Sequence, residues 1–396
     1  MSKTGFSRNA GRSCDARRRK AVAASGCRPE DRRRESTPCA ERFRPVEPNT
    51  SSPSTTAAGF RPGGNRPMRA FRNHRRSAFT LVELLTVIVI IGILASLISA
   101  AAIYARARAR EAAIHTEMRQ IEAALITYKS EYGEFPPDFW GLDGSAGVNA
   151  QNKAVEDLRR HLRKRWPKFA PGADPVAAFQ TALNTVNIDP GQFNPATALV
   201  FWLGGLPAEA PQPGVSYQPA GFHADPANPF QYGQPRQEPL YDFDPDKIYV
   251  VRVDPNNPSS QIINLYYYPV GEPNSSSPLV YFRAGRDKTT GRYEYGMVDG
   301  GAFIPASFTY APTNVAVPYL KGPANGSPSN PAVQRQWREP EKFQIIHCGL
   351  DGVFSTPIPP SNPPAAFRFT VSAEGFSDGD YDNVTNFVAK LEDEVE

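Results

Sequence analysis

The hydrophobic pattern of the chain changes abruptly at Phe79. Residues 1–67 show no hydrophobic period and almost no aliphatic side chains. Such a segment cannot bury enough apolar surface to offset the entropy of ordering, so we expect it to be disordered. Residues 84–104 then form a run of 21 residues without a charge. About 20 apolar residues in a helix span the hydrocarbon core of a bilayer, so this run predicts a transmembrane helix at 79–104.

Two other interpretations of the run at 84–104 stay open. A buried core helix would have to be covered by a body that is rich in polar residues. A secretory signal peptide usually has a shorter apolar region, and Ile98–Ala100 is only weakly permissive for cleavage. Under the transmembrane interpretation, arginines that precede the run predict a cytoplasmic N-terminus and an external body by the positive-inside rule. These are Arg69, Arg72, Arg75 and Arg76.

The helix is predicted to continue beyond the apolar run. Residues 105–113 contain strong helix formers and no helix breaker. Gly133 and the pair Pro136–Pro137 then mark the end of the helix. We expect a single helix whose amphipathic extension at 105–135 docks on an external domain at 136–396. The docking stripe consists of apolar residues at steps of four and three, namely Ile114, Met118, Ile121, Leu125 and Tyr128.

The external domain combines short helices with a β-rich C-terminal part. Residues 151–165 and 175–187 are predicted helices, and Pro195–Leu203 is a third candidate. From Lys247 onward, β-branched and aromatic runs alternate with Pro, Asn, Gly and Ser turns, which is typical of an antiparallel sheet. The runs are Ile248–Val253, Ile262–Tyr268, Leu279–Phe282 and Phe343–His347. The predicted fold class is α+β, with a long N-terminal transmembrane-to-amphipathic helix packed on a C-terminal antiparallel sheet domain.

The net charge divides the chain at the same place. Residues 1–78 hold 19 Lys+Arg and 6 Asp+Glu, which gives +13, and the remainder holds 25 against 34, which gives −9. An acidic body argues against nucleic-acid binding, so we expect no nucleic-acid partner. A basic nucleic-acid-binding arm at 1–67 is the weaker alternative. The other alternative is that translation begins at Met68, which leaves 68–78 as a short basic leader.

The segment Arg75-Arg-Ser-Ala-Phe-Thr-Leu-Val-Glu-Leu-Leu85 stands directly before the apolar run. It resembles the cleavage and methylation signature of type IV pilins and of the pseudopilins of type II secretion. The resemblance implies a pilin-like fold and a prepilin peptidase that cuts between Ala78 and Phe79 and methylates the new amine. Glu83 then becomes the fifth mature residue. The family usually has Gly where this chain has Ala78.

Glu83 is a candidate assembly residue. A carboxylate near the start of a membrane span is costly, which makes it a functional-site hypothesis. The resemblance implies that it pairs with the Phe79 amine of a neighbouring subunit during filament assembly. The alternative is that Glu83 extends to the lipid headgroups at a helix N-terminus, where the helix dipole favours an anion.

Two further features point to the major pseudopilin of type II secretion. Residues 125–137 look like the helix end and turn of that protein. The C-terminal part also holds carboxylates spaced by two residues, which suits oxygen ligation of a hard cation, and the resemblance implies a calcium loop there. The candidate Ca²⁺ ligands are Asp351, Asp378, Asp380 and Asp382. The alternative is a solvated Asp/Gly turn whose side chains bond their own backbone.

No enzyme is expected, because the five histidines show no paired metal spacing and no GxSxG motif is present. The predicted function is that of a pseudopilin-like structural subunit of a type II secretion or type IV pilus-like filament, serving protein transport. Its implied partners are the membrane, prepilin peptidase and other pilin-like subunits. Its predicted location is the inner membrane, single-pass, with a periplasmic C-terminal domain. The alternatives are an anchored external binding module that uses the prepilin pathway only for export and, more weakly, an anchored hydrolase.

Overall fold

The structure of the chain is a computed structural model. It describes residues 79–394 apart from 213–214, 272, 274, 313, 323–325, 356–366, 373–374 and 389. The predicted disordered segment 1–67, the predicted leader 68–78 and the cleavage residue Ala78 therefore lie outside the described residues.

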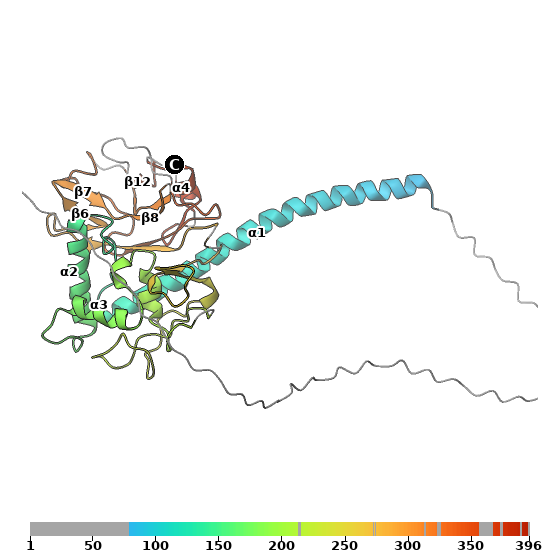
Figure 1. Cartoon of the computed structure of the whole chain (residues 1–396). Helices are drawn as coiled ribbons and strands as arrows, with labels where there is room; N and C mark the ends of the chain where they lie inside the picture. The colour runs from blue at the N-terminus through green and yellow to red at the C-terminus, as the bar shows by residue number, and fades with distance from the viewer. Residues whose placement is uncertain are drawn as a thin grey trace, which may run out of the picture. The chain divides into compact units, whose positions relative to one another are not determined.

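One long helix, α1, runs from Leu81 to Tyr132 over 52 residues (Figure 1). The predicted long helix is thus confirmed, and it is not interrupted between its apolar and amphipathic parts. Gly133 ends it with a left-handed φ of 78°, which glycine adopts without steric cost, and donates its N–H to the Lys129 carbonyl at 2.7 Å. The helix therefore stops at Tyr132, three residues before the predicted limit of the amphipathic extension.

The two halves of α1 have different surroundings. Residues 81–106 are exposed, and no described residue of the external domain buries them. Burial begins at Ile114 and follows the predicted stripe, whose members become part of the main hydrophobic core. The same helix therefore offers an open apolar surface at one end and supplies a core element at the other. The buried residues are Ile114, Met118, Ile121, Ala124, Leu125 and Tyr128.

Two further helices pack beside the end of α1. Helix α2 spans Val148–Arg165, and α3 spans Pro175–Thr185, where Asp174 caps it and Pro175 begins it. The third helical candidate forms a short π-helix at Val200–Gly204 (η2). Its residues Phe201 and Trp202 are fully buried among the aromatic side chains of the main core.

The C-terminal part is built of small sheets rather than one large one. Strands β1 (Ile248–Arg252) and β2 (Ile262–Tyr267) form an antiparallel pair. Strand β11 (Phe343–His347) lies antiparallel between β3 (Val280–Arg283) and β13 (Val384–Thr385). The fold is mixed α+β, as predicted, and only β10 and β12 pair in parallel among the described strands. The remaining strands are β4 (Gly285–Arg286), β5 (Tyr293–Glu294), β6 (Gly296–Asp299), β7 (Ala302–Pro305), β8 (Phe308–Ala311), β9 (Asn314–Ala316), β10 (Tyr319–Leu320) and β12 (Arg368–Phe369).

The domain also contains several short helical segments. A five-residue helix, α4, spans Asp378–Asp382 just before β13. The others are 3₁₀ turns at Pro190–Gln192 (η1), Pro245–Lys247 (η3) and Leu391–Glu394 (η4). A second hydrophobic cluster lies under β6, β7 and β8 and includes Tyr295, Phe303 and Trp337.

Candidate functional site

The first turn of α1 is held by a reciprocal pair of hydrogen bonds between Thr80 and Glu83. The Glu83 N–H donates to Thr80 Oγ1 at 3.2 Å, and the Thr80 N–H donates to Glu83 Oε2 at 3.0 Å. The Thr80 hydroxyl also donates to Oε2 at 2.9 Å. This is a capping box, which satisfies two of the backbone N–H groups that a helix start leaves unpaired.

The capping box gives Glu83 a local role that our sequence analysis missed. Its signal is present in the sequence as Thr80-Leu-Val-Glu83, the S/T-x-x-E pattern of a helix start. Both hydrogen bonds from Thr80 reach Oε2, so within the described residues Oε1 receives none. One carboxylate oxygen thus caps the helix, and the carboxylate stays exposed.

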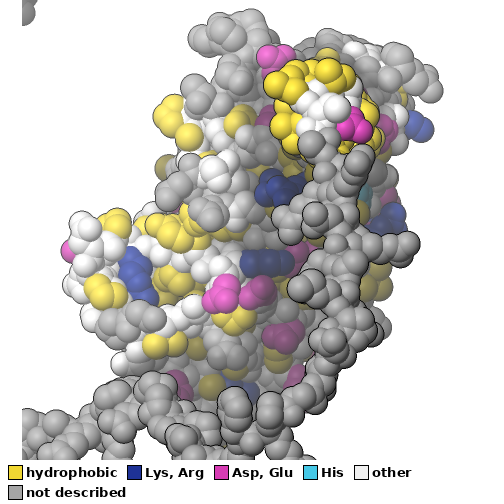
Figure 2. Space-filling view, turned by 90° about the vertical axis from the view of Figure 1, so that its right-hand side faces the viewer, with side chains coloured by type: hydrophobic (Ala, Val, Ile, Leu, Met, Phe, Trp, Pro, Cys, Tyr) yellow, Lys and Arg dark blue, Asp and Glu magenta, His cyan; other side chains and the backbone are white. Residues whose placement is uncertain are grey.

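The helix surface beyond the cap is apolar on every side. Figure 2 looks at the molecule from the N-terminal end of α1 and shows hydrophobic side chains around the helix. All large apolar side chains from Leu81 to Tyr104 are exposed, and Leu97 retains 64% of its accessible surface. By its length and composition α1 can cross a membrane, and none of its most apolar segment is buried in the domain. A fully exposed apolar helix of this length requires lipid or other apolar helices around it.

The family model of the prokaryotic N-terminal methylation motif matches residues 73–99. The chain carries a type IV pilin-like N-terminus. The match includes the predicted cleavage point at Ala78 and Phe79, the capping residue Glu83 and most of the apolar run. It ends before residues 125–137, so the likeness to the major pseudopilin stays a prediction. No curated protein and no solved structure matches the chain.

The pilin-like helix is tied to the external domain by a polar contact beside its apolar stripe. Glu117, on α1, forms an ion pair with Lys247 at 3.1 Å. It also accepts hydrogen bonds from the hydroxyl groups of Tyr241 and Tyr267. Because Lys247 ends η3 and Tyr267 ends β2, this one carboxylate joins the helix to the first strand pair.

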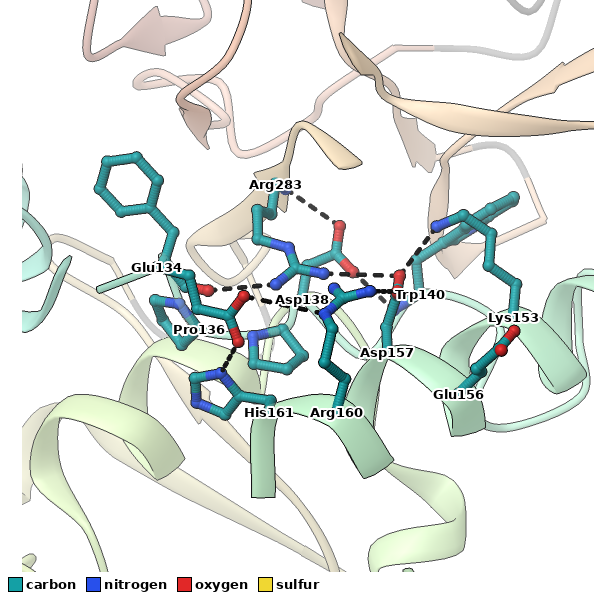
Figure 3. Close-up of polar contacts among 12 residues, drawn as sticks. Glu134, Pro136, Asp138, Trp140, Lys153, Glu156, Asp157, Arg160, His161 and Arg283 are labelled. Atoms are coloured by element: carbon teal, nitrogen blue, oxygen red, sulfur yellow. Dashed lines mark hydrogen bonds and ion pairs between the residues drawn. The ribbon is translucent and has the colours of Figure 1, made fainter. Parts of the chain in front are cut away.

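A second polar cluster fixes the chain where α1 ends (Figure 3). The buried Arg283 guanidinium, at the end of β3, donates to the Phe135 carbonyl at 3.1 Å and lies 3.4 Å from the Asp157 carboxylate on α2. The backbone N–H of Arg283 donates to Asp138 Oδ2 at 3.0 Å. Arg283 therefore ties the segment after α1 to both the sheet and α2.

Burial and positive neighbours set opposite pKa shifts in this cluster. Burial pushes the pKa of Asp157 up, but the nearby charges of Lys153, Arg283 and Arg160 outweigh it and bring the pKa down to about 2. Burial dominates at Asp138 and raises the pKa of that carboxyl despite the nearby Arg283. Asp157 is thus held ionised over the whole physiological pH range.

A chain of hydrogen bonds lies beside this cluster and fixes the protonation state of His161. Arg165 donates to the Tyr128 hydroxyl at 2.7 Å, and that hydroxyl lies 2.6 Å from His161 Nε2. His161 Nδ1 lies 2.8 Å from Glu134 Oε1. Since the tyrosine oxygen accepts from Arg165, its proton points to Nε2, so we assign the His161 proton to Nδ1. Burial lowers the pKa of His161 to about 4, which agrees with a neutral ring.

Three of the four predicted calcium ligands, Asp351, Asp380 and Asp382, have partners within the protein. Asp380 is buried, forms an ion pair with Arg368 at 3.3 Å and accepts a hydrogen bond from the Tyr319 hydroxyl at 3.0 Å. Asp382 accepts from the N–H of Asp351 at 3.0 Å and lies 3.4 Å from the Lys390 ammonium. Both carboxylates therefore have protein donors in the positions that a cation would occupy.

The other two candidates do not complete a cation site. Asp351 Oδ1 accepts the Val353 N–H at 2.9 Å, and Asp378 is exposed in the first turn of α4. Among the residues that the structure describes, no group of three or more His, Cys, Asp and Glu side chains could hold a metal ion. The two-residue spacing falls on the short helix α4, which turns alternate carboxylates in different directions, and the calcium site stays a prediction.

Proposed function

We propose that the chain, cut before Phe79, is a pseudopilin-like structural subunit of a type II secretion or type IV pilus-like filament. The observation that carries this proposal is the continuity of α1. One unbroken helix joins the methylation motif, an apolar surface exposed on all sides and the core of the external domain. A polymerising subunit needs these three parts in this order, because the exposed segment must pack with neighbours while the domain stays outside.

The length of the exposed segment supports anchoring in the inner membrane. At 1.5 Å per residue, residues 84–104 extend over about 32 Å, close to the bilayer core thickness of about 30 Å. Four arginines precede this segment and three follow it directly, so the positive-inside rule favours an N-terminus in the cytoplasm. They are Arg69, Arg72, Arg75 and Arg76 before it and Arg106, Arg108 and Arg110 after it. The external domain is thereby directed to the periplasm.

The first turn of α1 supports a role for Glu83 in assembly with other pilin-like subunits. Cleavage by a prepilin peptidase creates an amine at Phe79, four residues before Glu83. In an apolar environment an ammonium group and a carboxylate attract each other strongly, because little water screens them. The exposed Glu83 carboxylate can pair through Oε1 with the Phe79 amine of the next subunit, while Oε2 keeps the helix cap.

The histidines of the external domain support a structural rather than a catalytic role. Burial lowers the pKa of His161 and of His347 to about 4 each. A general base works best with a pKa near the ambient pH. His161 is instead held between Tyr128 and Glu134 within the core.

One observation favours the alternative of an anchored binding module. The external domain has a cavity of about 300 Å³ beside the end of α1, and its charged lining is mostly basic. Such a cavity suits an acidic group on a ligand. The charged residues of the lining are Lys129, Arg160, Arg283, Arg286, Glu134 and Glu341.

Cysteine crosslinking in membranes separates the two functions. Single cysteines at Leu85 and at Leu97 place reactive groups on the exposed apolar surface of α1 without touching the external core. A filament subunit gives crosslinked dimers, with a second copy or with another pilin-like protein, at each position, because one cysteine per chain can join only two chains. A chain that carries both cysteines gives ladders. A binding module that uses the pathway only for export stays monomeric at both, and that result would overturn the filament proposal.

A further inference from the structure

Three arginines surround α1 directly after the apolar run. Arg106, Arg108 and Arg110 are all exposed, and they alternate with alanines. At 100° per residue, Arg106 and Arg110 lie on one side of the helix and Arg108 lies on the opposite side. We call these three residues the arginine collar. The short alanine side chains between them leave the long arginine side chains room to bend along the helix.

Few contacts within the protein neutralise the collar. Arg108 donates to the Tyr104 hydroxyl and to Glu111, both at 3.0 Å, and its guanidinium lies 5.4 Å from the Tyr104 ring centre. Glu111 is the single acidic partner of the collar among the described residues, and no ion pair there involves Arg106 or Arg110. A net positive charge therefore remains on an exposed stretch of helix.

The depth of the collar follows from the length of the helix. If residues 84–104 fill the bilayer core, the following five or so residues cross the headgroup layer, which is about 5–8 Å thick. These residues contain the collar. Tyr104 then lies at the boundary, where tyrosine is favoured because its ring is apolar and its hydroxyl is polar. The first buried residue of α1, Ile114, follows only after this layer.

We propose that the arginine collar binds the phosphate groups of anionic phospholipids in the leaflet nearer the external domain. The inference rests on the membrane insertion of residues 84–104 proposed above. A guanidinium binds a phosphate with two parallel hydrogen bonds, and charges on both sides of the helix engage separate lipids around it. Depth favours lipid over the acidic surface of another subunit, because the collar lies among headgroups whenever the helix is inserted.

Photo-crosslinking in vesicles tests this directly. The full chain is reconstituted into phosphatidylcholine vesicles that contain phosphatidylglycerol with a photoreactive headgroup, and crosslinks are mapped by mass spectrometry. Mapping separates the collar from the basic residues 1–78, which also attract this lipid. The test variant is Arg106→Gln/Arg108→Gln/Arg110→Gln, and the matching triple Arg→Lys variant keeps the charge. The control replaces three exposed cations of the external domain, Arg163, Lys168 and Lys321, by Gln.

We expect crosslinks on residues 105–113, at least tenfold weaker in the Gln variant, since each basic residue near an anionic surface contributes roughly fivefold. The Lys variant and the control should keep most of the signal. Equal crosslinking in the Gln variant, or a wild-type chain that is inserted but has no lipid crosslinks on residues 105–113, would overturn the proposal for the collar alone. If carbonate washing removes the wild-type chain from the vesicles, the proposal of a membrane anchor is overturned, and the proposal for the collar falls with it.

Discussion

At the residue scale, Glu83 combines a cap that the structure shows with a pairing that we propose. The cap needs an oxygen acceptor at position 83, whereas the pairing needs a negative charge. These two requirements can be separated by substitution, because glutamine keeps a side-chain oxygen and loses the charge. The residue therefore offers a direct way to distinguish helix capping from subunit assembly.

Glu83→Gln and Glu83→Ala should both abolish crosslinking between copies in membranes. Removing one member of a charge pair from an apolar environment leaves the other charge there without a partner, which strongly disfavours assembly. The external domain should keep its urea midpoint, since Glu83 lies outside its core. If Glu83→Gln assembles normally and only Glu83→Ala fails, capping and not charge pairing explains the residue.

His161 makes the stability of the external domain depend on pH. Its pKa lies near 4 in the folded protein and near 6.5 in the unfolded chain, so between these values the unfolded state binds more protons. The free energy of unfolding should therefore fall as the pH drops from about 6.5 to about 4, by about 3 kcal/mol for this group. Glu134, whose pKa is lowered on balance by His161 and nearby arginines against the effect of burial, adds to the loss at the acidic end.

Urea unfolding at pH 7 and pH 5 measures this effect. His161→Gln should have a smaller difference between the two pH values than the wild type. His115→Gln is the matched control, because His115 lies on α1 outside the buried stripe and should keep the wild-type difference. An unchanged pH dependence in His161→Gln would show that another group is responsible.

At the scale of elements, α1 changes its role from surface to core within one helix. The sequence predicted this change because an uncharged run gives way to a stripe with helical spacing. The strands β1, β2, β3 and β11 were predictable from their β-branched and aromatic runs. Their division into small sheets was not, because long-range pairing is decided by packing between segments that lie far apart in the sequence.

The buried polar groups show where local patterns fail. The spacing of the carboxylates in the Asp378–Asp382 segment suggested a cation, which stays a prediction. It did not indicate that Arg368 and Tyr319, which lie far from one another in the sequence, bind Asp380. The cluster around Arg283 likewise joins three segments that no spacing rule connects. By contrast, the capping box at Thr80 is a local pattern, so the sequence alone could have predicted it.

The docking stripe of α1 can be tested with two adjacent residues. Leu125 is fully buried, whereas Ile126 keeps 56% of its accessible surface. Leu125→Ala should lower the free energy of unfolding by about 2–5 kcal/mol, because it leaves a cavity in the main core. Ile126→Ala should change it by less than about 0.5 kcal/mol. Equal effects in urea unfolding would mean that the helix docks through another face.

At the scale of the whole molecule, we propose a subunit that becomes mature by cleavage before Phe79. The exposed apolar segment, the capped first turn and the docked C-terminal half all follow Phe79 in the chain. Removal of the preceding residues takes away a net charge of +13 and leaves a chain with a net charge of −9. What remains is an apolar helix with a carboxylate and a new amine at its start and an acidic domain at its end.

The mass of the intact, membrane-extracted protein tests this account most directly. Our account predicts a chain that begins at Phe79 and carries a methylated amine, and hence a mass that corresponds to residues 79–396 plus one methyl group. The chain produced with prepilin peptidase absent should keep its leader. A retained leader in the presence of the peptidase, or a chain cut near Ala100, would contradict the account.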